Sequence, residues 1–303
     1  MIELIRNPNI DFLGKRNIAF FISGIFVIIG IIAIVQISTG RANLGIDFAG
    51  GTAIQLKFER HIALQAVREA LESSGLRDFD LQDLPTENKV LIRVKTTEQE
   101  LGQVSASITD IISQKLPDHQ YVVDSTMVIG PKVGGRLRAD AAKAVAMAVI
   151  GILIYVAFRF QFKFGVGATV AAFHDILVVL GIFFLSGKEI NLILVSALLT
   201  IFGYSLTDTV VVFDRIRENL KLRQRDSVER VMNGSINEVL SRTIITTLTL
   251  LLTSIALFFF GGEVLHDFSL AIIIGIIVGT YSSVFVASPV VLLWGGKKPF
   301  AKK

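Results

Sequence analysis

The sequence has no cysteine, a single tryptophan and few charged residues, which make up 18% of its 303 residues. Without cysteine there is no disulfide framework, no thiolate ligand for zinc and no thiol nucleophile. Soluble domains usually contain about 25% charged and about 45–50% apolar residues, whereas 52% of this chain is hydrophobic. The shortage of charge and the excess of apolar residues exclude a disordered chain, a secreted disulfide scaffold and an ordinary cytosolic enzyme.

Six apolar segments are long enough to cross a bilayer, which takes about 20 residues. They are continuously apolar rather than alternating, so each predicts a helix and not a barrel strand. The first is longer than the roughly 7–15 apolar residues of a signal peptide, and no A-x-A site follows it, which favours an uncleaved helix. We expect an α-helical polytopic membrane protein with six transmembrane helices over residues 18–37, 139–160, 164–186, 190–212, 240–260 and 268–293.

Lysine and arginine are placed unevenly around these segments. Fifteen of them lie before the first segment, between the second and third, between the fourth and fifth, and in the tail, whereas the opposite short turns contain only Lys188. Because short cytoplasmic loops are enriched in basic residues, both termini (1–17 and 294–303) and a basic loop over 213–239 are predicted to be cytoplasmic. The net charge of +4 therefore reflects the excess of lysine and arginine on one side of the membrane. Nothing else in the sequence supports nucleic-acid binding.

Residues 38–138 are polar enough to fold in water and are placed outside the membrane by helix parity. Alternating or helical apolar spacing predicts the order β-α-β-β-α-β, which is typical of a ferredoxin-like α+β domain. The expected strands are 52–58, 79–84, 90–94 and 121–129, and the expected helices are 62–74 and 97–115. We interpret this exported domain as a binding module with glycine-rich hinges at 44–52 and 130–135, because it contains no metal cluster or catalytic constellation.

Three ionisable positions lie inside the predicted helices, where charge is costly and usually functional. Asp175 lies midway along 164–186 beside His174, Asp208 lies in 190–212, and Arg242 lies near the start of 240–260. Asp208 and Arg242 fall at comparable depth on consecutive antiparallel helices. We therefore expect them to be neighbours, with Arg242 as the counter-charge.

Helical spacing adds hydroxyl groups to this region. Tyr204 precedes Asp208 by four residues, and Thr246 follows Arg242 by four, so each pair shares one helix face. Burial and a nearby arginine act in opposite directions on how readily a carboxylate holds a proton. The pattern favours a proton site at Asp208, with Tyr204 and Thr246 as hydrogen-bond partners, over a permanent ion pair that only fixes packing.

Two further features have structural alternatives. Asp175 with His174 is either a proton relay or a satisfied interhelical hydrogen bond. Small residues four apart in 268–293, among them Gly275, Gly279 and Ser283, form a ridge that lets another helix approach closely. For this ridge, helix packing is the preferred interpretation.

Six segments carry a resemblance to a known family: LGIDFAGGT (44–52), GPKVGGRL (130–137), AFHDI (172–176), GYSLTDTVVVFDRIREN (203–219), SRTIITT (241–247) and YSSVFVASP (281–289). In them the chain resembles the SecF branch of the SecD/SecF family of bacterial protein-export membrane proteins, within the resistance-nodulation-division superfamily. The resemblance covers nearly the whole chain. One departure is Thr207, where the family usually has asparagine.

The resemblance implies a non-enzymatic, multi-pass subunit of the bacterial cytoplasmic membrane that works with a separate SecD, the SecYEG channel and SecA. It implies that the proton gradient, with no other cofactor, helps to draw translocating preproteins outward, and that Asp208 and Arg242 are the coupling residues. Three alternatives remain at this stage: a small-molecule exporter of the same fold, a passive membrane scaffold, and an intramembrane aspartyl protease that would use Asp175 and Asp208.

Overall fold

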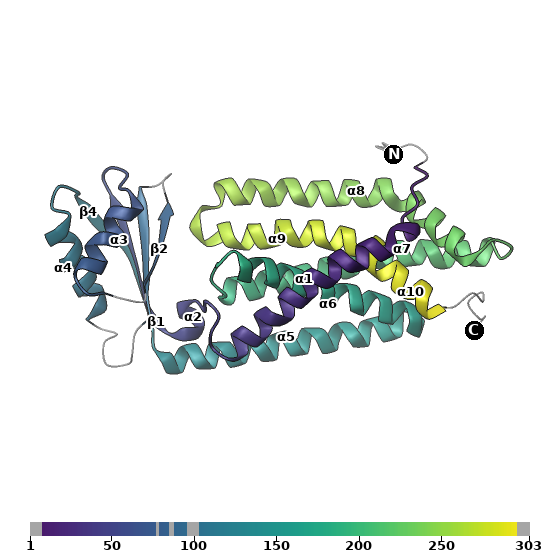
Figure 1. Cartoon of the computed structure of the whole chain (residues 1–303), viewed down its shortest axis with the longest axis horizontal. Coiled ribbons are helices and arrows are strands. Elements are labelled where there is room, and N and C mark those ends of the chain that lie inside the picture. The colour runs from purple at the N-terminus through teal and green to yellow at the C-terminus, as the bar shows by residue number, and fades with distance from the viewer. Residues whose placement is uncertain (1–7, 77–78, 85–87, 96–102, 296–303) are drawn as a thin grey trace. The chain divides into compact units, whose positions relative to one another are not determined.

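The computed structural model describes residues 8–76, 79–84, 88–95 and 103–295. The chain divides into two compact units, one formed by residues 1–43 with 144–303 and the other by residues 44–143. The first unit is helical and the second contains the sheet (Figure 1). The sheet-containing unit, 44–143, is shifted by a few residues toward the C-terminus relative to the expected exported domain, 38–138.

The sheet unit has the βαββαβ order. Its elements are β1 (Gly51–Phe58), α3 (Leu64–Ser73), β2 (Phe79–Leu84), β3 (Lys89–Val94), α4 (Val104–Lys115) and β4 (Tyr121–Ile129). The strands pair antiparallel in the order β2-β3-β1-β4, which confirms the ferredoxin-like prediction. The expected beginning of the second helix at 97 lies outside the described residues.

Strand alternation explains the core of this unit. Side chains on one face of the sheet, such as Ile54 and Ile92, are fully buried against Leu71 of α3 and Ile108 of α4. Every second strand residue points to this face, so two amphipathic helices suffice to cover it. β4 is an edge strand, and most of its side chains are exposed.

The two glycine-rich segments contact each other at the base of the sheet unit. Gly50 has a φ of +80°, and a Cβ placed there would lie 2.8 Å from the Cα of Pro131. A Cβ on Gly134 would lie 2.9 Å from the backbone nitrogen of Gly50. Only glycine allows this φ and this approach without strain. The segments that we interpreted as hinges therefore form a close backbone contact.

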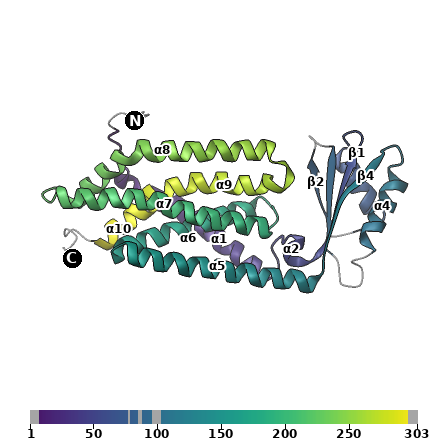
Figure 2. The ribbon, with the colours of Figure 1, turned by 180° about the vertical axis from the view of Figure 1, so that it is seen from behind.

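Within the residues that the structure describes, six helices are long and apolar enough to cross a membrane, as predicted. They are α1 (Arg16–Ser38), α5 (Pro131–Arg159), α6 (Phe162–Leu185), α7 (Leu192–Leu222), α8 (Val228–Phe260) and α9 (Gly262–Ser282), the last continued by a π-helical turn (Ser283–Ala287) and α10 (Ser288–Gly295). In the helical unit, α8 and α9 run side by side in both views (Figures 1 and 2).

Three helices extend well beyond the spans that we expected, and the first of them, α5, begins at Pro131 rather than at 139. α7 continues to Leu222 and α8 begins at Val228, so most of the predicted loop 213–239 is a helical hairpin. Its charged surface suggested a loop, but Ile216 and Met232 are buried in the same cluster. Glu238 accepts hydrogen bonds from Arg215 (2.6 Å) and Arg223 (2.7 Å) across the hairpin. Inward apolar and outward paired side chains are what a solvated two-helix hairpin requires.

Burial is uneven among the six helices. About half of the apolar window of α6, α7 and α9 is buried inside the chain (56%, 44% and 50%), compared with 6% for α5 and 11% for α8. α6, α7 and α9 contact one another and form the centre of the helical unit. This centre holds both buried carboxylates of the membrane helices.

Candidate functional site

Asp208 lies on α7, which contacts both α8 and α9. Its side chain is buried, and the hydroxyl groups of Thr243 on α8 and of Ser283 after α9 lie beside its carboxylate. Its Oδ2 atom has no partner of full hydrogen-bond geometry within the part of the chain that the structure describes. A charged carboxylate in an apolar interior is costly unless it is paired. Asp208 is therefore a position where a proton or a counter-charge would be stabilising.

A series of hydroxyl groups crosses the same three helices. Tyr204 Oη on α7 lies 3.3 Å from Thr247 Oγ1 on α8, which lies 2.9 Å from Thr280 Oγ1 on α9. A mainly apolar groove of about 340 Å³ runs beside them, lined by residues that include Thr243, Thr247 and Thr280. Polar side chains on three helices thus converge near Asp208.

Arg242 does not approach Asp208. Although α7 and α8 pack against each other, the Arg242 side chain is exposed on α8, and among residues with described positions no ion pair reaches its guanidinium. Successive residues of a helix are separated by about 100°, and the residue of α8 that turns toward Asp208 is Thr243. Thr243 takes the place in which we expected Arg242.

Two other expected partners also point elsewhere. Thr246 is exposed and donates to carbonyls of its own helix, those of Thr243 (2.9 Å) and Arg242 (3.2 Å), so Tyr204 reaches Thr247 instead. Thr207 is exposed and donates to the carbonyl of Gly203 at 3.0 Å. The side chain at position 207 therefore points away from Asp208, and the difference from asparagine does not reach this carboxylate directly.

Asp175 forms a second buried polar group near the middle of α6. Its side chain is fully buried, and its Oδ1 lies 2.9 Å from His174 Nδ1. Its Oδ2 accepts hydrogen bonds from Ser205 Oγ on α7 and from Ser282 Oγ on α9, the latter at 2.7 Å. Asp175 and Asp208 act on each other electrostatically, but each has its own set of neighbours. This is not the shared dyad that an aspartyl protease requires.

The small residues of α9 pack on α7 of the same chain. A Cβ on Gly275 would lie 2.4 Å from Ile201 Cγ1, and one on Gly279 would lie 3.4 Å from Ser205 Cβ and 3.6 Å from Asp175 Oδ2. Ser283 begins the π-helical turn, which is closed by a hydrogen bond of 3.0 Å from Ser288 Oγ to the carbonyl of Ser283. Such turns are rare and frequently occur at functional sites.

Sequence reasoning missed several hydroxyl groups of both sites: Ser205, Thr243, Thr247, Thr280 and Ser282. Ser205 could have been found, because it precedes Asp208 by three residues and so shares its helix face. The others lie on helices whose rotation relative to α7 is set by packing, and no spacing within one helix reveals that rotation.

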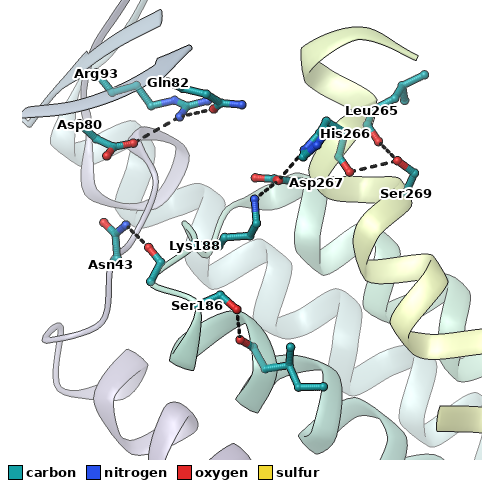
Figure 3. A network of polar contacts seen from close by, with 12 residues as sticks. Asn43, Asp80, Gln82, Arg93, Ser186, Lys188, Leu265, His266, Asp267 and Ser269 are labelled. Atoms are coloured by element: carbon teal, nitrogen blue, oxygen red, sulfur yellow. Dashed lines mark hydrogen bonds and ion pairs between the residues drawn. The ribbon is translucent and has the colours of Figure 1, made fainter. Parts of the chain in front are cut away.

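A third polar cluster closes one end of the helical unit (Figure 3). Lys188, in the turn after α6, donates to Asp267 Oδ1 at 2.6 Å, and His266 Nδ1 lies 3.2 Å from the same oxygen. Gly187 belongs to the same turn, and its carbonyl accepts a hydrogen bond of 3.1 Å from the side chain of Asn43. The contact between Lys188 and Asp267 joins the turn after α6 to the beginning of α9.

Family comparisons agree with the motifs. Residues 109–297 match the family described as protein export membrane protein SecD/SecF, C-terminal, and residues 39–60 match the SecD/SecF GG motif. The chain is 56% identical to the protein translocase subunit SecF of Thermodesulfovibrio yellowstonii, over 97% of this chain and 98% of that protein. It is 45% identical to the SecF of Calditerrivibrio nitroreducens, over 96% of each chain.

A solved structure has the same fold. The crystal structure of SecDF from Thermus thermophilus, titled a translocon-associated membrane protein, matches 95% of this chain with a TM-score of 0.80 and 36% identity. A second SecDF structure, titled the super-membrane-facing form, matches 97% of this chain with a TM-score of 0.70. This chain spans 39% and 40% of those two longer chains.

Proposed function

Because the chain belongs to the SecD/SecF family of protein-export membrane proteins, as a SecF translocase subunit, we propose that it couples proton movement at Asp208 to the export of preproteins. Its place in the Sec export machinery as an accessory multi-pass membrane protein follows from the family. The proton coupling, the orientation and the further partners are the proposal.

The observation that carries the proposal is the unpartnered oxygen of Asp208. A buried carboxylate with an unsatisfied atom is poorly stabilised as a permanent anion in a membrane, and Thr243 and Ser283 supply only neutral groups beside it. The ionised carboxylate favours hydrogen bonds donated by Thr243 and Ser283, whereas the protonated form can itself donate. Binding or loss of a proton therefore changes the contacts between α7 and its neighbours. One charge that crosses a potential of 100 mV supplies about 2.3 kcal/mol, which is enough to shift packing between helices.

Arg242 has a different position in this proposal. It lies with Thr246, Thr249 and Thr253 on exposed positions of α8, whose apolar window is 11% buried. A polar stripe within a span faces protein or water rather than lipid. We assign SecD as the protein that covers this stripe, so that Arg242 acts at the boundary between the two subunits. The matched SecDF structures support SecD as the partner.

The remaining assignments follow the family and the basic residues. Both termini and the α7–α8 hairpin lie in the cytoplasm of a bacterium, because this side holds nearly all lysine and arginine of the short loops. The sheet unit lies outside the cytoplasmic membrane, where it meets the translocating preprotein. SecYEG and SecA are the channel and motor with which the pair works, and no cofactor is needed besides the proton gradient.

The decisive experiment is Asp208→Asn in proteoliposomes that contain this subunit with SecD, SecYEG and SecA. We expect the variant to lose the stimulation of late preprotein translocation by a proton gradient, because an amide of the same shape cannot titrate. Asp214→Asn is the matched control, since Asp214 lies on the same helix and pairs with Arg159. Stimulation as in the wild type by the Asp208→Asn variant would overturn the proposal.

A further inference from the structure

We propose that Asp175 is a second proton-binding group of the helical unit, with His174 as the side chain that receives the proton and Ser282 as the hydroxyl that transmits the change to α9. This inference deepens the proposed function and rests on it. It assigns a second site to the proton path, separate from Asp208.

The donors around Asp175 suit its ionised form. Ser205 and Ser282 donate to Oδ2, and His174 donates to Oδ1 when its hydrogen is on Nδ1. These three donors come from α7, α9 and α6, and each is itself buried. Charge-assisted hydrogen bonds of this kind are about twice as strong as neutral ones, so the anion is held without any cationic partner.

The same atoms also suit the protonated form. Ser282 Oγ lies 2.7 Å from Asp175 Oδ2 and 3.1 Å from the carbonyl oxygen of Gly279. When Oδ1 gains a proton, its O–H can donate to His174 Nδ1, and Oδ2 becomes a neutral oxygen that accepts hydrogen bonds less strongly. The Ser282 hydroxyl hydrogen can then turn to the Gly279 carbonyl. Asp175 Oδ2 keeps Ser205 as its donor and Ser282 keeps the Gly279 carbonyl as its acceptor, so one hydrogen bond has moved from between α6 and α9 into α9 itself.

His174 supplies the route by which a proton reaches Asp175. Its side chain is 6% exposed, and Nε2 has no hydrogen-bond partner among the described residues. A buried polar atom without a partner is destabilising, which points to this nitrogen as the atom that receives a proton. A proton that binds Nε2 allows the Nδ1 proton to pass to Asp175 Oδ1, and the imidazole is again neutral as the other tautomer.

Few other charges act on this group. The titratable side chains on the helices packed against α6 at this level are Asp208 and Tyr204 on α7 and Tyr281 on α9. Residues 17–38 of α1 and residues 283–295 contain none. Tyr281 Oη donates to the carbonyl of Ala19 at 3.1 Å. Asp208 is therefore the one further carboxylate that interacts with Asp175.

The two carboxylates are connected through the same two helices. Ser205 and Asp208 lie one turn apart on α7, and Ser282 and Ser283 are adjacent at the end of α9. A change in the hydrogen bonds of Asp175 therefore reaches the same two helices that surround Asp208.

The test is an infrared pH titration of carboxyl groups in the subunit reconstituted with SecD. We compare Asp208→Asn with the double variant Asp208→Asn/Asp175→Asn. The single variant is expected to retain a protonated-carboxyl band that titrates and that the double variant lacks. Ser282→Ala removes one donor from the anion, so the band is expected to persist to higher pH in that background. Ser113→Ala in the sheet unit is the control and should leave the band unchanged.

The second site would be overturned if the single and double variants, both folded, gave identical titrations and if Ser282→Ala did not shift the band. Preprotein export by Asp175→Asn and Asp175→Glu is measured in parallel, with loss in the first and partial recovery in the second expected. If Asp175 fails to titrate while Asp208→Asn abolishes gradient stimulation, only this inference fails. If Asp175 titrates while Asp208→Asn is fully stimulated, the proposed role of Asp208 fails instead.

Discussion

At the scale of single residues, unsatisfied polar atoms are concentrated around the two carboxylates. The described residues include six buried side-chain atoms without a hydrogen-bond partner, and four of them belong to His174, Asp208, Thr209 and Thr243. Native proteins pair nearly all such atoms, and exceptions need an explanation. The proposed proton coupling accounts for these exceptions, because such atoms would gain a proton or a partner when a carboxylate changes its charge.

Two asparagines elsewhere in the helical unit have hydrogen-bond partners for both their donor and their acceptor atoms. Asn233 and Asn237 of α8 bind the backbone before α1: Asn237 accepts from Ile10 N (3.0 Å), Asn233 accepts from Phe12 N (2.9 Å), and both donate to the carbonyl of Ile10. These side chains are fully used. They fix the segment before the first membrane helix against the hairpin.

We predict that Asn237→Ala releases this segment. The change removes the partner of the Ile10 amide in a part-buried hydrogen bond, and such a bond contributes about 0.5–1.5 kcal/mol. Hydrogen exchange measured by mass spectrometry should become faster at Ile10 and Phe12. Gln224→Ala, which removes an exposed amide that contacts only the carbonyl of Lys221, should leave this exchange unchanged. Unaltered exchange in Asn237→Ala would mean that apolar packing alone holds the segment.

At the scale of elements, α1 and α6 cross through two glycines. A Cβ on Gly30 would lie 2.2 Å from the carbonyl oxygen of Leu177, and one on Gly181 would lie 3.0 Å from the backbone nitrogen of Gly30. The backbones therefore touch without intervening side chains, as in other small-residue contacts between membrane helices. The crossing fixes α1 against the helix that carries His174 and Asp175.

We predict that Gly30→Ala destabilises this crossing by about 1–3 kcal/mol, because the clash is with backbone and cannot be relieved by a side-chain rotation. Gly24→Ala is the matched control on the same helix, where nothing lies within 4 Å of the added Cβ. Thermal unfolding in detergent should show a lower midpoint for Gly30→Ala and little change for Gly24→Ala. Equal midpoints for the two variants would contradict the crossing.

Elements were more predictable from the sequence than contacts between them. Six long apolar runs and the βαββαβ spacing were sufficient for the architecture, and the rarity of charge in the spans singled out Asp175 and Asp208. Periodicity gives directions within one helix only, so it could not tell whether Arg242 or Thr243 turns toward α7. Gly30 belongs to no repeated spacing of small residues, so its contact with α6 could not be predicted. The many charged residues of 213–239 predicted a loop, although most of this segment is helical.

At the scale of the molecule, the uncovered helices of the helical unit differ in chemistry. The exposed side chains of α1 are apolar and include Ile18, Phe21 and Ile28, which suits lipid. The exposed side of α8 includes Arg242 and Thr249, which suits a protein surface. On the proposed function, α1 faces lipid and the polar positions of α8 face SecD.

We predict that cysteine cross-linking distinguishes these sides. Since the chain has no cysteine, Thr249→Cys and Phe21→Cys can each be made in the natural sequence. With SecD that carries cysteines on its own membrane helices, Thr249→Cys should form disulfides upon oxidation and Phe21→Cys should form few. Cross-links from Phe21→Cys but not from Thr249→Cys would place SecD on the other side.

The uninterrupted course of α7 makes it a lever. Fourteen residues separate Asp208 from Leu222, a distance of roughly 21 Å along the axis at 1.5 Å per residue. A tilt of about 5° around Asp208 would displace the far end by roughly 2 Å over that length. Because the hairpin clamps α7 to α8 through Glu238, the displacement is shared by both helices. On the proposed function, a proton bound at Asp208 would thereby move the far end of the α7–α8 hairpin, without any flexible linker between the two.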